Sequence, residues 1–386
     1  MQVAKRMASI TPFYVMELLR RAKQLEAEGK EIIHMEIGEP DYGTPEPIIE
    51  SGLAYIKKGQ VKYTPAAGLP ALRQKISRFY QDQYQVNVPM ERIFITPGAS
   101  GAFLLALGVS LDPGTDILLA DPSYPCNQNF IQLFSGTAKY VPVGADTAYQ
   151  LSVDLVRRHW QAKTGGVLIA SPSNPTGSLI SRLQLEKIIQ FIDTQQGILF
   201  SDEIYHGLVY EPGIASALQL SEQVFVMNSF SKYFGMTGWR IGWLVVPPQF
   251  IEATEKLAQN IFISTSSHSQ YAALAAFDAE TLLELENRRL DFKQKRDFLH
   301  TNLVRLGFKI PIKPAGAFYI YADCSQFTYD SFQFAEQLLE VEGVAVTPGK
   351  DFGSNNSHHY LRFAYTSSLQ EIAKAIQRLE RFIKNL

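Results

Sequence analysis

One lysine in this sequence stands in a setting suited to covalent chemistry. Lys232 lies between small polar residues in the segment 228–242, and Arg240 follows it eight positions later. A lysine amine forms a Schiff base with an aldehyde when burial or a nearby positive charge lowers its pKa. The hydroxyl of Ser229 and the guanidinium of Arg240 are suited to binding phosphate oxygens. The segment therefore predicts a site for a phosphorylated aldehyde, whereas the alternative is a solvated lysine in a surface loop.

Polar residues also follow three predicted buried strands. The segments 121–125, 171–177 and 202–205 each come directly after a short apolar run. In a mainly parallel sheet, ligands bind at the carboxyl ends of the strands. A further turn at residues 97–102 leads into an apolar helix expected at 103–111, and the free amides of a helix start favour phosphate. Each motif alone is also typical of an ordinary turn or helix cap, but together they indicate one shared site.

The elements that carry these motifs alternate along the chain. Short apolar strands are expected at residues 92–96, 117–120, 137–143, 166–171, 197–201, 224–229 and 242–246. Helical periodicity lies between several of them, for example at 153–160 and 181–194. Apolar strands that alternate with helices predict a mainly parallel sheet covered on both faces.

The pattern changes from about residue 280. A long charged helix (282–306) precedes a mixture of strands (318–322, 344–347, 360–364) and helices (331–340, 369–386), and a further helix is expected at 11–29. We therefore expect a large domain at residues 46–284 and a small domain built from 1–45 and 285–386.

Composition narrows the class of protein. The 386 residues are 46% hydrophobic and carry a net charge of −2, which is typical of a packed protein without general attraction to nucleic acid or anionic membranes. Cys126 and Cys324 are too few for a disulfide scaffold and lack metal-ligand spacing, so we expect a cytoplasmic protein without a bound metal. No signal peptide or membrane-spanning run is visible.

The ordered motifs from Gly38 to Arg362 resemble the class I and II aminotransferases, pyridoxal-phosphate enzymes of fold type I. This resemblance implies an α/β protein whose large domain has a mainly parallel seven-stranded sheet covered by helices, beside a smaller α+β domain. It also implies pyridoxal 5'-phosphate as the cofactor and a homodimer with shared active sites. The implied reaction moves an amino group between an L-amino acid and a 2-oxo acid by a ping-pong mechanism.

The resemblance assigns roles around the cofactor ring. Lys232 matches the lysine that binds the cofactor covalently and moves the substrate proton. Asp202 matches the carboxylate that pairs with the pyridine nitrogen and keeps it protonated. Tyr205 and Asn174 match the pair that hydrogen-bonds the ring hydroxyl oxygen, and Tyr124 matches the aromatic residue that stacks on the ring.

The resemblance also assigns residues to the phosphate of the cofactor and to the carboxylate of the substrate. The residues that match the phosphate site are Ala99, Ser100, Gly101, Ser229 and Arg240, joined by Tyr63 from the partner subunit. Arg362 matches the arginine that binds the substrate carboxylate through two hydrogen bonds. Gly38 supplies a backbone contact to that carboxylate, and Asn174 also lies on the substrate side.

The substrate is less well defined by the sequence. Family members specific for dicarboxylates need a second cation, and the comparable segment 260–270 contains no Lys or Arg, so strict aspartate specificity is not expected. Candidates for an apolar or aromatic pocket are Phe13, Tyr14, Tyr42, Ile261 and Phe262. His268 is a candidate partner for a polar substrate.

Two alternative functions would use the same residues. A carbon–sulfur beta-lyase uses the same constellation with a different leaving group. A non-catalytic regulator that binds pyridoxal phosphate needs an added DNA-binding module, and few residues precede Gly38. A nicotinamide-dependent dehydrogenase is not favoured, because the sequence lacks a Gly-x-Gly-x-x-Gly turn.

Overall fold

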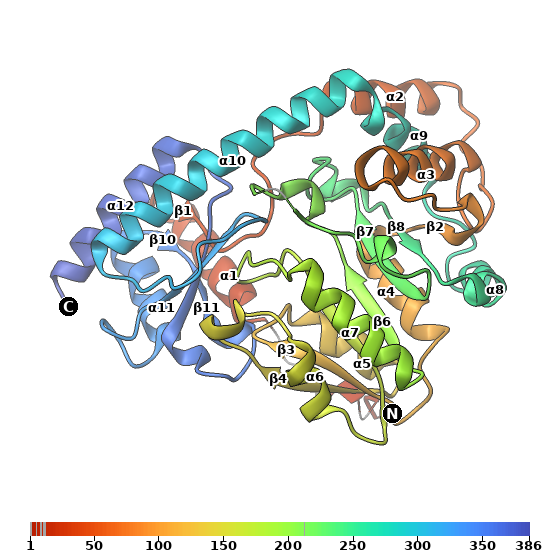
Figure 1. Ribbon diagram of the computed structural model, residues 1–386. Coiled ribbons are helices and arrows are strands. Elements are labelled where there is room, and N and C mark those ends of the chain that lie inside the picture. Colours follow the sequence, from red (N-terminus) through yellow and green to blue (C-terminus); the bar gives the residue numbers. More distant parts are fainter. Residues whose placement is uncertain (1, 5, 8–9, 11–12, 212) are drawn as a thin grey trace.

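The computed structural model describes residues 2–4, 6–7, 10, 13–211 and 213–386 (Figure 1). Its main sheet has seven strands in the order β2-β8-β7-β6-β5-β3-β4. These are β2 (Ile93–Thr96), β8 (Gly242–Val245), β7 (Val224–Ser229), β6 (Ile198–Asp202), β5 (Thr164–Ala170), β3 (Asp116–Asp121) and β4 (Thr137–Pro142). Only β8 runs antiparallel to its neighbours within this sheet. The prediction of an α/β fold with a mainly parallel seven-stranded sheet is confirmed.

Both faces of the sheet are covered because successive side chains of a strand point to opposite sides. Leu118 packs in one apolar cluster, whereas its neighbours Ile117 and Leu119 pack in another. The first cluster includes residues of α3 (Pro70–Tyr84), α6 (Val153–His159) and α7 (Arg182–Thr194), and the second includes residues of α4 (Gly98–Gly108), α5 (Cys126–Leu133) and α8 (Ile251–Ile261). Two more helices, α2 (Glu46–Lys57) and α9 (Ser267–Ala273), pack on each other. Continuous apolar strands such as β2, β7 and β8 are therefore stable here, since both of their faces are buried, whereas the edge strand β4 is partly exposed.

A third apolar cluster joins the two ends of the chain. It combines residues of α1 (Tyr14–Ala27) with residues of α11 (Ser331–Glu342) and α12 (Leu369–Lys384). Strand β1 (Ile33–His34) pairs in parallel with β10 (Val344–Ala345), and β11 (Thr347–Pro348), β12 (Tyr360–Ala364) and β9 (Tyr319–Asp323) form an antiparallel sheet. The single strand expected at 344–347 is thus divided between two sheets. We propose the division into residues 46–284 and 1–45 with 285–386, and this separate core supports it.

Helix α10 (Ala279–Leu306) connects the two parts. Figure 1 shows it running from the region of α2 and α9 to the side of α12. Leu285 near its start belongs to the first cluster, whereas Phe292 and Leu299 belong to the third. Among the described residues, no helix is both long and apolar enough to cross a membrane.

The start of α4 lies directly against the first residue of β8, Gly242. This helix begins at Gly98, earlier than the expected residue 103, so Ala99 and Ser100 lie in its first turn. A Cβ atom on Gly242 would lie 2.8 Å from the carbonyl carbon of Gly98 and 3.0 Å from the nitrogen of Ala99. The close approach therefore requires a residue without a side chain at position 242.

We expect Gly242→Ala to lower the free energy of unfolding by about 1–3 kcal/mol, because the added methyl group must push α4 away from β8. Urea unfolding at a fixed protein concentration measures this change. Gly238→Ala is the matched control, since a Cβ atom there meets nothing within 4 Å. Equal midpoints for the two variants would contradict the packing argument.

Candidate active site

A cavity of about 340 Å³ lies at the carboxyl ends of the central strands. Asp202 ends β6, Ser229 ends β7, and Tyr124 follows β3. The start of α4 contributes Ser100, and Arg362 of β12 reaches the cavity from the C-terminal part of the chain. Parallel strands bring these residues together because their carboxyl ends meet at one edge of the sheet.

Most of the predicted site residues line this cavity. They are Gly38, Ala99, Ser100, Tyr124, Asn174, Asp202, Tyr205, Ser229, Lys232, Arg240 and Arg362. Gly101 does not line it, because its backbone N–H bonds to the carbonyl of Pro97 within the first turn of α4. Tyr63 is also outside the cavity, and 81% of its surface is exposed.

Lys232 is a buried amine whose pKa is lowered toward neutral pH. Its Nζ donates a hydrogen bond to the backbone carbonyl of Gly38 over 2.7 Å. Burial lowers the pKa of Lys232 to about 8; Glu39 opposes this shift, and Arg362 and Arg240 add to it. The amine is therefore neutral, and able to act as a nucleophile, far more often than that of an ordinary lysine.

Asp202 is a buried carboxylate with no charged partner. Its Oδ1 accepts a hydrogen bond from the backbone N–H of Ile204 over 3.1 Å. Burial raises the pKa of Asp202 to about 7, and the neighbouring carboxylate of Glu203 adds to the shift. Among the described residues the backbone N–H opposes this shift and no cation does. The site is thus arranged to accept a positively charged or protonated group.

Tyr205 and Asn174 each form a hydrogen bond with another side chain that lines the cavity. The Tyr205 hydroxyl shares a hydrogen bond of 2.9 Å with the hydroxyl of Tyr319. Burial raises the pKa of Tyr205 well above its ordinary value, so the hydroxyl keeps its proton. Tyr319 was not picked out from the sequence, because it follows no recognisable motif. A Cβ atom on Gly38 would lie 1.9 Å from the Tyr319 hydroxyl oxygen, so the glycine is needed for this arrangement.

Arg362 is held in place in the cavity by three hydrogen bonds. Its Nη1 donates to Oδ1 of Asn174 over 2.9 Å, and its Nη2 donates to the carbonyl of Glu36 and to Oγ1 of Thr347. The guanidinium lies over the ring of Tyr319, 4.3 Å from its centroid. Its buried Nε has no hydrogen-bond partner. A fixed guanidinium of this kind is suited to binding a carboxylate.

The opposite side of the cavity is suited to a phosphate. The Ser229 hydroxyl donates to that of Ser231, which also lines the cavity and was not predicted. Arg240 has a left-handed backbone, and a Cβ atom on Gly98 would lie 2.7 Å from its Nη2. Hydroxyl groups, a guanidinium and a helix start therefore lie together.

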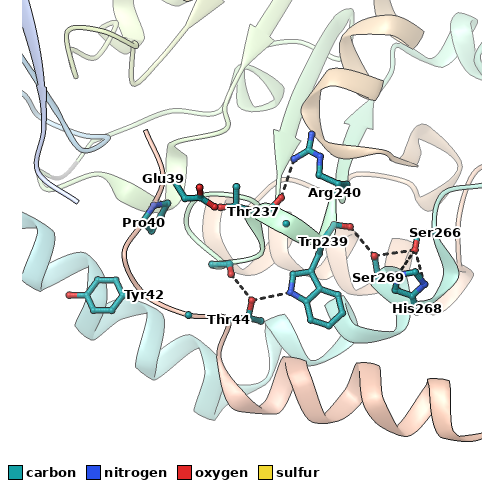
Figure 2. Close-up of a pocket in the computed structure, with 13 residues that line it drawn as sticks. Glu39, Pro40, Tyr42, Thr44, Thr237, Trp239, Arg240, Ser266, His268 and Ser269 are labelled. Atoms are coloured by element: carbon teal, nitrogen blue, oxygen red, sulfur yellow. Dashed lines mark hydrogen bonds between the residues drawn. The ribbon is translucent and has the colours of Figure 1, made fainter. Parts of the chain in front are cut away.

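Arg240 also borders a second, more open cavity of about 620 Å³. Figure 2 shows Arg240 bonded to the carbonyl of Thr237, with Trp239, Ser266 and His268 nearby. His268, predicted as a partner for a polar substrate, lines this second cavity rather than that of Lys232.

Only one of the five predicted apolar pocket residues lines the cavity of Lys232. Phe13 does, whereas Tyr14, Tyr42, Ile261 and Phe262 do not. Tyr42 instead lines the second cavity. The sequence could not reveal this, because the residues next to these four in the chain carry no information on their distance from Lys232.

Known proteins with similar sequences share one family. Residues 30–379 match the family model described as aminotransferase class I and II. The chain is 38% identical over 384 residues to a (5-formylfuran-3-yl)methyl phosphate transaminase of Methanocaldococcus jannaschii, and the match covers 99% of each. It is 36% identical over 374 residues to a valine–pyruvate aminotransferase of Mycobacterium tuberculosis, with 96% of each covered. A crystal structure of an aminotransferase from Mycobacterium tuberculosis has a TM-score of 0.97 at 35% identity, and all of both chains is covered.

We expect Asp202→Asn to stabilise the protein when no small molecule is bound. The folded-state pKa of about 7 lies above the ordinary value of 3.8. The carboxyl is protonated in both states below about pH 4, and stability is lost as the pH rises to about 7, because only the unfolded chain ionises freely. The thermal midpoint of the variant should therefore exceed that of the native protein by an amount that grows over this range and is constant above it.

Glu203 is present in both proteins, so its own titration contributes to both curves. A difference in midpoint that does not change between about pH 5 and pH 8 would contradict the raised pKa of Asp202.

Proposed function

Because the chain belongs to the class I and II aminotransferases, we propose that its cavity holds pyridoxal 5'-phosphate during amino transfer. The observation that carries this proposal is the presence in one cavity of a buried lysine with a lowered pKa and a buried carboxylate with a raised pKa. Amino transfer between an amino acid and a 2-oxo acid is the activity of the family.

The donor set fits the three reactive parts of this cofactor. The Lys232 amine is suited to its aldehyde, and the Asp202 carboxylate is suited to a protonated ring nitrogen. The phosphate group fits the cluster of Ser100, Ser229 and Arg240, because hydroxyls, a cation and a helix start favour an anion. When bound, the cofactor supplies an electron-withdrawing ring that stabilises negative charge on the substrate α carbon.

Asp202 would hold the ring nitrogen protonated, and the positive partner would remove the penalty of its own burial. The Tyr205 hydroxyl, which keeps its proton, would donate to the ring oxygen, and the amide nitrogen of Asn174 would donate beside it. Tyr124 would pack against the ring face. These contacts would orient the ring beside Lys232.

Lys232 would move the proton of the reaction. Its Nζ, once free of the cofactor, accepts the proton from the substrate α carbon and later returns it. Arg362 would hold the substrate carboxylate through its guanidinium and so fix the α carbon relative to Lys232. The order of events is ping-pong, since one site serves the amino acid and the 2-oxo acid in turn.

We also propose a cytoplasmic homodimer in which Tyr63 acts in the partner's site. Two observations support this assembly: Tyr63 projects a largely exposed aromatic side chain, and Arg240 borders a second cavity open to the surface. The free thiols of Cys126 and Cys324 support a reducing compartment.

Lys232→Ala should lose covalent attachment of the cofactor and lower kcat by about 10³-fold, because no other group replaces its amine. After borohydride treatment, mass spectrometry should show one reduced pyridoxyl phosphate group on the native protein and none on the variant. Lys187→Ala, on the exposed face of α7, is the matched control. Covalent attachment in Lys232→Ala would refute the assignment of the lysine.

Mixing inactive variants tests the shared site. Tyr63→Ala and Lys232→Ala subunits, unfolded and refolded together, should recover about a quarter of the native activity, since half the dimers are mixed and each has one intact site. Each variant refolded alone is the control. If Tyr63 acted within its own subunit, mixing would restore nothing.

A further inference from the structure

Part of the lining of the Lys232 cavity is apolar. This part is built by Phe13, which precedes α1, and by the first turns of α1. Four side chains from this segment line it, namely Phe13, Val15, Met16 and Leu19, and Phe352 lines it from the C-terminal part. Met16 is 55% exposed although it borders a cavity. We call these five residues the α1 wall. Exposed apolar side chains around a cavity favour an apolar ligand, because its binding removes their surface from water.

The α1 wall is fixed to the substrate side by Asp351. The Asp351 carboxylate accepts the backbone N–H groups of Tyr14 and Val15, each over 2.8 Å. Phe13, the residue before α1, makes no side-chain cap of its own. The distant carboxylate therefore satisfies the start of the helix and sets where its first turn lies.

The wall also lies beside the carboxylate-binding arginine. Phe352 follows Asp351 directly, and the Arg362 guanidinium lies 4.9 Å from the centroid of its ring. A substrate whose carboxylate is bound by Arg362 is therefore held next to Phe352. Its side chain has apolar surface available on this side of the cavity.

The charges of the described residues oppose an acidic side chain there. Three cations line the cavity: Lys232, Arg240 and Arg362, and the proposed function engages each of them. The carboxylates of Glu36 and Asp351 also line the cavity; Oε2 of Glu36 is buried without a hydrogen-bond partner among the described residues, whereas its Oε1 pairs with His34 over 2.7 Å. A second substrate carboxylate would lose its hydration and meet like charges.

We propose that the α1 wall binds the substrate side chain, so that the enzyme prefers amino acids with large apolar or aromatic side chains over dicarboxylic ones. This inference rests on the proposed function, because it takes Arg362 as the site of the α-carboxylate. Met16 and Phe352 then determine specificity.

Steady-state kinetics of the cofactor-loaded enzyme with phenylalanine and with aspartate test the preference. The native enzyme should show a kcat/KM for phenylalanine about tenfold or more above that for aspartate. Met16→Arg should lower this ratio about tenfold, since it places a cation in the apolar wall. Gln24→Arg adds the same charge to the exposed part of α1, outside the cavity, and should leave the ratio unchanged.

Binding provides a readout that does not depend on turnover. Calorimetry with 3-phenylpropanoate and with glutarate, which carry no amino or oxo group, should give tighter binding of 3-phenylpropanoate to the native holoenzyme. Met16→Arg should shift the preference toward glutarate. This arm uses the native protein first, so it holds even if a variant folds poorly.

The outcomes separate the two proposals. If no amino acid supports amino transfer, the proposed function fails and the inference fails with it. If the native enzyme transaminates but prefers aspartate and glutarate, the function stands and the inference is overturned. If Met16→Arg keeps the native ratio and the native ligand preference, the α1 wall does not select the substrate.

Discussion

The site depends on the burial of two ionisable groups that are not paired with each other. The Lys232 amine bonds to the carbonyl of Gly38, and the Asp202 carboxylate bonds to the backbone N–H of Ile204. Burial costs each charge free energy that no salt bridge among the described residues offsets, and it moves the pKa of the amine down and that of the carboxyl up toward neutrality. A ligand that is an electrophile at one end and a base at the other relieves both costs. The surrounding fold holds these two groups apart and buried.

The main sheet largely determines where these two groups lie. Strands β6 and β7 are neighbours in parallel register, with Asp202 beside Met227, so the carboxylate and the segment that carries Lys232 leave the sheet at the same edge. Helix α4 closes against β8 and adds a positive helix end to the phosphate side. The chain ends then supply Gly38 and Arg362. The cavity therefore combines polar residues from the strand ends with residues from the two ends of the chain.

Much of this could be predicted because the signals are local. Runs of apolar residues specify the seven strands, since a strand buried on both faces needs them whatever its neighbours are. Asp202, Asn174 and Lys232 stand directly after such strands, and parallel topology brings these positions to one edge. The start of α4 was placed too late, because small residues such as Ala99 and Ser100 are compatible with both a turn and a first helical turn.

The sequence by itself determined the order of the helices and strands and the residues at the strand ends, because each of these depends on neighbours in the chain. Only the tertiary structure decided which distant residues meet them. Tyr319 reaches Tyr205, and the Asp351 carboxylate caps α1 across most of the length of the chain. It also placed Gly101 outside the lining of the cavity, with its N–H bonded to the carbonyl of Pro97. Such contacts leave no periodic pattern, because they depend on how segments far apart in the sequence pack together.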